Sequence, residues 1–320
     1  MRTVLVTGGS GLAGRALREC VPAPSKTRFE FWGSADCDLT DEAQTLARVA
    51  ALRPDCIVNL AAARGGVGLS RRKPASLLRD NLRIGLNVLE AARRCGVRKV
   101  VLCLSNGMYP SDAPQPYRED DVHRGPPHAA DYAYAHAKRC LEPMVRAWRE
   151  QYELCVVGVS PNGIIGVHDR FDAEQGNMTG ALIARIDAAR HHDEPVAVWG
   201  DGTARRELSF AGDVARDVLW VLEHYDDPRI LNVGTDEEVS VREVALGVAA
   251  LLDVDLARIR FDPSRPGGIP RRRTDTSRYR ALSGNRYLPF AEALRRTVAG
   301  YRAARSTARP RAAEARAVAT

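Results

Sequence analysis

The sequence predicts an α/β protein in which a doubly wound parallel sheet is joined to a smaller α/β lobe. The first observation is an apolar run that leads into a glycine-rich turn directly after the start of the chain. The second is a regular alternation of apolar runs and amphipathic segments up to about residue 165, which is typical of β-α-β successions. The third is that this alternation weakens beyond Gly166, where Pro, Gly and Arg surround only short apolar patterns.

The glycine-rich turn is the most informative feature of the chain. Residues 3–14 read Thr-Val-Leu-Val-Thr-Gly-Gly-Ser-Gly-Leu-Ala-Gly. The spacing of Gly8, Gly11 and Gly14 permits a tight turn, a close backbone approach to a pyrophosphate, and close packing of the next helix. A helix beginning at Leu12 would offer free N–H groups and its positive dipole end to the phosphates. This pattern predicts a Rossmann-type dinucleotide-binding start.

Periodicity predicts the elements that follow this turn. Short apolar runs indicate strands at Phe29–Trp32, Cys56–Leu60, Lys99–Leu104 and Leu154–Ser160. Apolar residues three and four apart indicate helices at Leu12–Cys20, Glu42–Leu52, Pro74–Cys95 and Tyr132–Tyr152. Gly96 suits the position after a helix end. The expected result is a parallel sheet wrapped on both faces by helices.

The chain is predicted to divide into two discontinuous lobes and a tail. We expect a helix at Asp213–His224, capped by Asp213, and a strand at Ile230–Val233 to return to the large sheet. The dinucleotide-binding lobe would therefore comprise residues 1–165 and about 208–235, and the substrate lobe residues 166–207 and 236–300. Residues 301–320, mostly Ala and Arg, are expected to form a frayed, flexible tail or a loose helix.

The amino-acid composition indicates which class of protein this is. The 320 residues are 45% apolar, as in a soluble globular enzyme with a sizeable core. No apolar run has the length of a membrane span, and no signal-peptide pattern precedes the first strand, so we expect a cytoplasmic protein without a membrane partner. The seven cysteines are scattered without C-x-x-C spacing, which predicts reduced thiols and no metal site.

The net charge of +7 does not by itself indicate a nucleic-acid partner. The basic excess is spread along the chain among 40 acidic residues, and no aromatic pattern accompanies the basic clusters at 71–73, 205–206 and 271–273. We therefore expect no nucleic-acid partner. An anionic diphosphate substrate explains some of these arginines equally well.

The end of the second expected strand bears on the choice of dinucleotide. Phe31-Trp32-Gly33-Ser34 lacks the acidic residue that commonly binds the adenosine ribose hydroxyls. Because no carboxylate would repel a 2′-phosphate there, and Ser34 could hold one, NADP(H) is favoured, while NAD(H) stays possible if the ribose is held from elsewhere. Asp38 and Leu39 precede a helix and could contact adenine, although Asp38 suits a turn or a helix cap equally well.

Tyr134-Ala135-His136-Ala137-Lys138 is the second strong pattern. Residues four apart share one helix face, so the Lys138 ammonium can favour loss of the Tyr134 proton and reach a nicotinamide ribose. The phenol then becomes a usable proton donor. Ser105 ends the strand expected at 99–104, at the sheet edge where ligands bind, and its hydroxyl can hydrogen-bond a substrate carbonyl. We predict Ser105, Tyr134 and Lys138 as catalytic residues.

This set, in this order, resembles the Ser/Thr, Tyr, Lys set of the short-chain dehydrogenase/reductases. Length and later motifs are similar to the extended branch, the NAD-dependent epimerase/dehydratase family of nucleotide-sugar enzymes. Within it, about residues 1–300 resemble the GDP-L-fucose synthases, which act as NADPH-dependent 3,5-epimerases and 4-reductases on GDP-4-keto-6-deoxy-mannose. The segments that carry this resemblance are 59–63 (NLAAA), 105–110 (SNGMYP), 166–169 (GVHD), 198–207 (VWGDGTARRE), 232–235 (NVGT) and 266–272 (PGGIPRR).

The departures from that family matter most. The family epimerises with a cysteine two residues after the serine, where this chain has Gly107, and with a histidine in the loop after Gly-x-His-Asp, where this chain has Asn177. Glycine and asparagine cannot remove and return carbon-bound protons. The expected activity is therefore C4 ketoreduction of a nucleotide-activated 4-keto-6-deoxy sugar without movement of the C3 and C5 stereocentres.

The resemblance also implies contacts with cofactor and substrate. Arg185, Arg206 and Arg272 fall where the family places basic residues near the nucleotide diphosphate, and Trp199 where a ring lines the nucleotide pocket. It further implies that Ala61 and Ala62 border the cofactor and that Asn106, Gly107 and Asn177 border the sugar. A structural role is expected for His168. A homodimer through the helices at 74–95 and 132–152 is implied by the resemblance alone.

Three functions stay open at this point. The first is the NADPH-dependent 4-ketoreductase. The second is either a bifunctional epimerase/reductase similar to GDP-L-fucose synthase, or a sugar-nucleotide epimerase or dehydratase. The latter would keep NAD tightly bound and use Tyr134 to oxidise and re-reduce its sugar. The third is a dinucleotide-sensing binding protein, against which the intact Ser105, Tyr134 and Lys138 argue, because a sensor needs no proton donor beside the nicotinamide.

Overall fold

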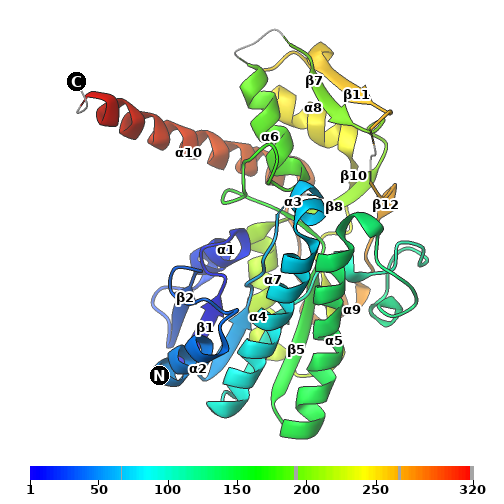
Figure 1. Cartoon of the computed structure of the whole chain (residues 1–320). Coiled ribbons are helices and arrows are strands. Elements are labelled where there is room, and N and C mark those ends of the chain that lie inside the picture. Colours follow the sequence, from blue (N-terminus) through cyan, green and yellow to red (C-terminus); the bar gives the residue numbers. More distant parts are fainter. Residues whose placement is uncertain (66, 191–193, 266–267, 318–320) are drawn as a thin grey trace.

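The chain folds around a six-stranded, fully parallel sheet in the order β2-β1-β3-β4-β5-β9. The computed structural model describes residues 1–65, 67–190, 194–265 and 268–317 (Figure 1). The strands are β1 (Arg2–Thr7), β2 (Thr27–Trp32), β3 (Cys56–Asn59), β4 (Lys99–Cys103), β5 (Cys155–Pro161) and β9 (Leu231–Val233). Their carboxyl ends share one edge of the sheet, where ligands bind in such folds.

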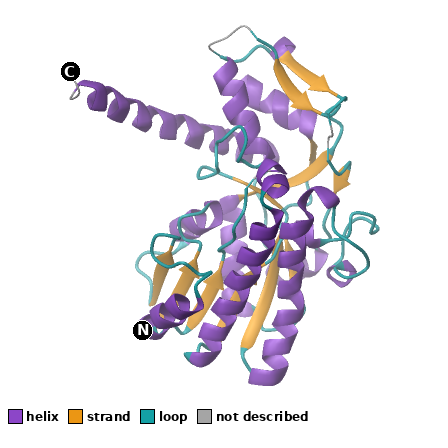
Figure 2. Ribbon diagram, viewed as in Figure 1, coloured by secondary structure: helices purple, strands orange, loops and turns teal. Residues whose placement is uncertain are grey.

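Helices cover both faces of this sheet, as Figure 2 shows. One face packs against α1 (Leu12–Cys20) and α7 (Ala211–His224), which also contact each other. The other face packs against α2 (Glu42–Leu52), α4 (Pro74–Arg94) and α5 (Tyr132–Tyr152). The predicted doubly wound Rossmann-type architecture is confirmed.

The predicted elements of this sheet agree with the structure to within about two residues at each end. The capping residue of α7 differs from the prediction, because Phe210, not Asp213, occupies the N-cap position. Asp213 instead lies buried in the first turn, where its carboxylate accepts a hydrogen bond from the backbone N–H of Leu288 at 2.8 Å. The expected cap was therefore wrong, since a tertiary contact uses that carboxylate.

A smaller α/β part follows in the upper region of Figure 1. Strand β8 (Arg205–Phe210) pairs with β6 (Gly163–Ile165), β10 (Glu238–Ser240) and β12 (Arg271–Arg272), and β7 (Val196–Trp199) pairs with β11 (Ile259–Asp262). A separate apolar core joins these strands to α6 (Met178–Ala189), α8 (Val241–Leu251) and the first half of α10 (Phe290–Ala317). The boundaries proposed for the two lobes stay a prediction.

Short elements and the C-terminal helix complete the chain. The short helices α3 (Val67–Arg72) and α9 (Ser277–Ser283) and the 3-10 turns η1 (Asn106–Met108), η2 (Glu119–Asp121), η3 (Ala129–Asp131) and η4 (Leu256–Arg258) connect the larger elements. Helix α10 projects from the body in Figure 1, and the stretch expected to be a flexible tail or a loose helix is helical up to Ala317.

Three further properties concern the described residues. None of their helices has the length and hydropathy needed to cross a bilayer. The seven cysteines are all free thiols. Within the same ranges, no group of three or more His, Cys, Asp or Glu residues is arranged to hold a metal ion.

Candidate functional site

The glycine-rich turn forms a cradle of bare backbone between β1 and α1. Gly8 has a φ of +71°, and a Cβ atom there would lie 2.7 Å from the backbone nitrogen of Ala61. A Cβ atom at Gly14 would overlap the carbonyl oxygen of Gly8. Gly11 occupies the N-cap of α1 and offers no side-chain cap, so the N–H groups of the first turn, from Leu12 onward, are left for an anion. This cradle fits a dinucleotide pyrophosphate.

Residue Asn59 fixes the neighbouring backbone at the carboxyl end of β3. Its Oδ1 accepts a hydrogen bond from the Thr7 hydroxyl at 2.7 Å and another from the Ala61 N–H at 3.2 Å. Ala61 thereby lies against Gly8. Ala62 follows and is exposed. The role of both alanines toward a cofactor stays a prediction.

A pocket of about 380 Å³ opens beside the glycine turn. The guanidinium carbon of Arg18 lies 4.4 Å from the ring centroid of Phe31 within it. His168 also faces it and lies 2.5 Å from a carboxylate oxygen of Glu19, consistent with a structural role. The lining residues are Gly9, Ser10, Arg15, Arg18, Glu19, Phe31, Gly33, Asp36 and His168. Two arginines at this place could hold a phosphate on the adenosine half of a dinucleotide.

Asp36 lines this pocket close to the end of β2. No acidic residue ends β2 itself, but Asp36 folds back so that its Oδ2 accepts a hydrogen bond from the Gly33 N–H at 2.7 Å. Ser34 is exposed. Asp38 uses its Oδ1 to accept from the Thr40 N–H and hydroxyl, at 2.9 and 2.7 Å, so it stabilises a turn. Leu39 is buried in the core. Contacts of these side chains with adenine stay predictions.

The three predicted catalytic residues lie at the carboxyl edge of the sheet around the end of β4. Lys138 donates a hydrogen bond from Nζ to the carbonyl oxygen of Cys103 at 2.8 Å, which joins α5 to the last residue of that strand. Ser105 follows two residues later and accepts a hydrogen bond from the Gly107 N–H at 3.2 Å. Tyr134, one helical turn before Lys138, is 5% exposed. A hydroxyl, a phenol and an ammonium are thus gathered in one region.

Arg272 reaches the same region from the smaller part of the chain. The backbone of Tyr117 holds the segment around Arg272 in place. The Tyr117 N–H donates a hydrogen bond to the Arg273 carbonyl at 2.9 Å, and the Tyr117 carbonyl accepts one from the Asp275 N–H at 2.8 Å. As a result, Nη1 of Arg272 lies 3.9 Å from the point where a Cβ atom of residue 107 would be. Asn106 is buried beside Gly107.

Arg206 is the second cation here. Burial, followed by the charge of Arg272, lowers the pKa of Arg206 to about 10. Burial also lowers the pKa of Arg272. A nearby anion would relieve the repulsion between the two guanidinium groups, as the planar donors of arginine suit phosphate oxygens. The structure therefore brings together two of the three predicted diphosphate ligands.

Arg185 and Trp199 form a second group, around β7. Arg185 donates from Nη1 to the Ala197 carbonyl at 3.4 Å, two residues before Trp199. The Trp199 side chain is 46% exposed, and the guanidinium carbon of Arg265 lies 5.5 Å from its ring centroid. An exposed indole beside two arginines is suited to a nucleobase and its phosphates.

Asn177 occupies the N-cap of α6 and is exposed. Its neighbour is Asp169, whose burial raises the carboxyl pKa to about 6, an effect that the Arg170 N–H and the Asn177 amide oppose. Among the contacts of the described residues, none joins Asn177 directly to Ser105 or Tyr134. The position that would carry a histidine in the resembling family thus holds a neutral amide.

Sequence reasoning missed two side chains of this site. Arg64 places its guanidinium carbon 4.4 Å from the ring centroid of Tyr134. His128 accepts a hydrogen bond at Nδ1 from the Ala130 N–H at 3.3 Å, and burial, followed by the charges of Arg272 and Arg206, lowers its pKa. The signal for Arg64 was its place just after a buried strand, at the sheet edge that binds ligands. No local pattern pointed to His128.

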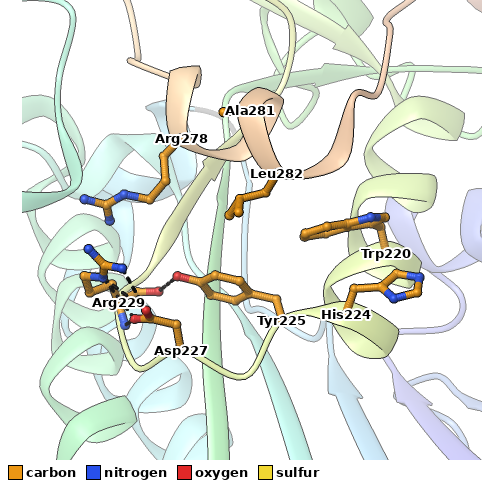
Figure 3. A pocket seen from close by; sticks show the side chains of 8 residues that line it. All are labelled: Trp220, His224, Tyr225, Asp227, Arg229, Arg278, Ala281 and Leu282. Atoms are coloured by element: carbon orange, nitrogen blue, oxygen red, sulfur yellow. Dashed lines mark hydrogen bonds and ion pairs between the residues drawn. The ribbon is translucent and has the colours of Figure 1, made fainter.

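A separate pocket of about 520 Å³ lies elsewhere (Figure 3). There the Tyr225 hydroxyl donates to the Arg229 carbonyl at 2.7 Å, and Asp227 binds the Arg229 guanidinium. Its walls are Trp220, His224, Tyr225, Asp227, Arg229, Arg278, Ala281 and Leu282, from α7, α9 and the loop after α7. None of the predicted site residues lines it.

Comparison with known proteins agrees with this geometry. The model of the NAD dependent epimerase/dehydratase family matches residues 4–234. The chain belongs to this family. The match spans the glycine turn and the Ser105, Tyr134 and Lys138 set, so the resemblance drawn from the sequence is confirmed.

Individual relatives extend the match beyond that region. A GDP-L-fucose synthase of Dictyostelium discoideum is 32% identical over 271 residues, which cover 83% of this chain and 84% of that protein. A dTDP-4-dehydro-6-deoxy-D-allose reductase of a Streptomyces species is 30% identical over 320 residues, covering 94% of this chain and 96% of that protein. A GDP-L-fucose synthetase of Naegleria fowleri, solved with NADP, superposes with a TM-score of 0.89 at 28% identity, covering 96% of this chain and 95% of that one.

Proposed function

We propose that this protein is an NADPH-dependent C4-ketoreductase of a nucleotide-activated 4-keto-6-deoxy sugar, with GDP as the expected nucleotide, and that it lacks 3,5-epimerase activity. The observation that carries the proposal is the pairing of an intact Ser105, Tyr134 and Lys138 set with Gly107 at the position of the family's cysteine. Reduction needs the first three residues, whereas epimerisation needs an acid/base that glycine cannot supply.

The residues present fit NADPH. The glycine cradle leaves no room for side chains and would hold the pyrophosphate, while Arg15 and Arg18 in the adjacent pocket would hold the 2′-phosphate. The Naegleria structure was solved with NADP, which supports the same choice. When bound, NADPH supplies the hydride that reduces the C4 carbon.

The side chains would divide the remaining work among them. The Ser105 hydroxyl donates a hydrogen bond to the substrate carbonyl oxygen and orients it. Tyr134 transfers its phenolic proton to that oxygen as the alcohol forms, and it regains a proton from solvent. Lys138, held by the Cys103 carbonyl, places its positive charge one helical turn from Tyr134 and stabilises the negative charge left on the phenol oxygen.

The same site explains why C3 and C5 would keep their configuration. Inversion beside a ketone needs one group to remove a carbon-bound proton and another to return one on the opposite face. Gly107 has no side chain, and the Asn177 amide neither gains nor loses a proton near neutral pH. Arg206 and Arg272 would bind the diphosphate, and Arg185 and Trp199 the nucleoside end. We also propose a cytoplasmic homodimer, on the family resemblance.

The test is to incubate the purified protein with NADPH and GDP-4-keto-6-deoxy-mannose in deuterated water. NADPH oxidation should accompany formation of an alcohol without deuterium at C3 or C5, detected by NMR and mass spectrometry. Deuterium at both carbons would overturn the absence of epimerase activity. No oxidation with either GDP-linked or dTDP-linked keto sugars would reject the reductase. Interconversion of sugar isomers by tightly bound NAD, with no net NADPH oxidation, would instead identify an epimerase.

A further inference from the structure

The guanidinium group of Arg64 lies over the aromatic ring of Tyr134, with its carbon 4.4 Å from the ring centroid. Arg64 belongs to the loop after β3, and neither the catalytic set nor the diphosphate ligands include it. Tyr134 is the proton donor of the proposed reductase, so the inference drawn here rests on that function. A cation over the face of a phenol is attracted by the ring electrons, and more strongly when the oxygen carries negative charge.

Hydrogen bonds fix the backbone from which the Arg64 side chain extends. The preceding residue, Ala63, donates its N–H to Oδ1 of Asn81 at 3.1 Å, and Asn81 returns a hydrogen bond from Nδ2 to the Ala63 carbonyl at 2.8 Å. Asn81 also donates to the Leu77 carbonyl within α4 at 2.7 Å and is 4% exposed. A buried amide with all these bonds holds the loop firmly, since breaking them would leave polar groups unpaired.

The tip of Arg64 is held at the N-terminus of α5. Its Nη1 lies 3.7 Å from Oδ2 of Asp131, the N-cap residue of the helix that carries Tyr134. The other oxygen of Asp131 accepts a hydrogen bond from the Ser70 hydroxyl of α3 at 2.8 Å. Ser70 thus orients the Asp131 carboxylate. That carboxylate, three residues before Tyr134 in the sequence, fixes the position of the Arg64 guanidinium.

The position of Arg64 is electrostatically unfavourable with respect to a second cation, Arg272. After burial, the charge of Arg64 is one of the causes that lower the pKa of Arg272, so the two cations repel each other. The Arg64 side chain is 42% exposed, and a free surface arginine would turn toward water instead. Anchors at both ends hold it on the phenol despite this repulsion, which points to a role at the reaction centre.

We propose that Arg64 is a positioning residue for Tyr134. Its planar guanidinium holds the phenol ring at the angle from which the hydroxyl meets the substrate carbonyl oxygen. Its charge also stabilises the phenol oxygen once the proton has left. Because this second interaction strengthens as the proton moves, it lowers the barrier more than it improves ground-state binding, and it acts on kcat more than on KM.

The test replaces Arg64 in the full-length enzyme with NADPH bound. Arg64→Met keeps the aliphatic bulk and should lower kcat about tenfold to a hundredfold. KM for the keto sugar and the Kd of NADPH should stay within about threefold. The solvent deuterium isotope effect on kcat should increase, because proton transfer becomes slower relative to other steps. Arg64→Lys should recover part of the loss.

Arg93→Met is the matched control. The guanidinium carbon of Arg93 lies 4.9 Å from the ring centroid of Tyr152, which is the same kind of contact at the other end of α5. This variant should keep the parental kcat. An Arg64→Met kcat within twofold of the parent, or an equal loss in Arg93→Met, would overturn the proposal.

Failure of the underlying function can be told apart from failure of this inference. If the parent enzyme reduces no keto sugar, the reductase proposal fails, but crystal structures of the NADPH complexes still decide the role of Arg64. A displaced or multiply oriented Tyr134 ring in Arg64→Met supports positioning. The same single ring orientation in parent and variant overturns it.

Discussion

Arg272 lies close to Gly107, with Nη1 of Arg272 3.9 Å from the place of a Cβ atom at residue 107. The nearest other atom to that place is the Ser105 hydroxyl oxygen, at 3.4 Å, which is ordinary van der Waals contact. Gly107 also has no positive φ, so its backbone conformation suits a side chain. The absence of a side chain is therefore not imposed by the fold, and a nucleophile or base can be introduced there.

The double variant Gly107→Cys with Asn177→His should restore proton exchange at the sugar. Both changes place acid/base groups where the resembling family has them, and a thiol near Ser105 would have space. In deuterated water with the keto sugar and no NADPH, we expect deuterium to enter C3 or C5, measured by NMR.

Gly107→Ala serves as the control for this variant, because it adds the Cβ atom without a titratable group. It should show no exchange while keeping reductase activity within about tenfold of the parent. Equal deuterium incorporation in the double variant and in Gly107→Ala would contradict the assignment of these two positions.

Tyr134→Phe should lower kcat by about two to four powers of ten. The substitution removes the phenolic hydroxyl group, while the buried ring and its contact with Arg64 remain. NADPH should bind with unchanged Kd, measured by fluorescence titration. Tyr132→Phe is the control, since Tyr132 lies on the same helix and is 50% exposed. A Tyr134→Phe enzyme that reduced its substrate at the parental rate would disprove the proton-donor role.

Arg18→Met should weaken NADPH binding about tenfold and leave NADH binding within about twofold. Arg18 lines the pocket beside the glycine turn, where only NADPH would present a phosphate. Binding of both cofactors is measured by isothermal titration. The control Arg48→Met removes a guanidinium that lies 5.3 Å from the Trp32 ring and outside this pocket. An equal loss for both cofactors would mean that Arg18 does not read the 2′-phosphate.

The large sheet could be predicted from sequence because its signals are local. The apolar run that leads into Gly8 indicates one turn, and the four-residue spacing of Tyr134 and Lys138 indicates one helix face. The carboxyl edge of a parallel sheet then brings these residues together. The fold and the approximate region of Ser105 followed from these signals alone.

The remaining features depend on the geometry of individual turns and on tertiary contacts. Asp36 enters the cofactor pocket because a single turn folds it onto Gly33, and Arg64 meets Tyr134 because Asn81 and Asp131, both far away in sequence, hold its loop. No periodicity encodes such contacts. The strands of the smaller part could not be predicted for the same reason, since they are short and pair across long separations in the chain.

The buried carboxyl group of Glu207 should make the stability of the fold depend on pH. This residue, 2% exposed beside Arg206, accepts hydrogen bonds at Oε2 from the Thr274 N–H and hydroxyl at 2.9 and 2.7 Å. Its other oxygen, Oε1, has no hydrogen-bond partner among the described residues. Burial raises the pKa of Glu207 to about 7, compared with 4.5 for a free side chain. Asp169 and Asp217, also buried, have pKa values raised to about 6.

A carboxyl group whose pKa is higher in the folded state holds its proton longer there than in the unfolded chain. With respect to Glu207, the free energy of unfolding should therefore be greatest below about pH 4.5, and it should fall as pH rises from there to about 7. Each pKa unit corresponds to about 1.4 kcal/mol, so the contribution of this group is on the order of 3 kcal/mol. Above pH 7 the loss is complete and the slope from Glu207 disappears.

Glu207→Gln should flatten this dependence. A neutral amide can still accept the two hydrogen bonds from Thr274, but it has no charge to bury as pH rises. The variant should be more stable than the parent at pH 8, by about 1 to 3 kcal/mol, and similar to it near pH 4.5. Urea unfolding of both proteins between pH 4.5 and 8 measures the difference. Glu150→Gln, in an exposed pair with Arg146, is the control and should follow the parent at every pH. A difference between Glu207→Gln and the parent that stays constant from pH 4.5 to 8 would show that the Glu207 carboxyl titrates normally in the folded protein.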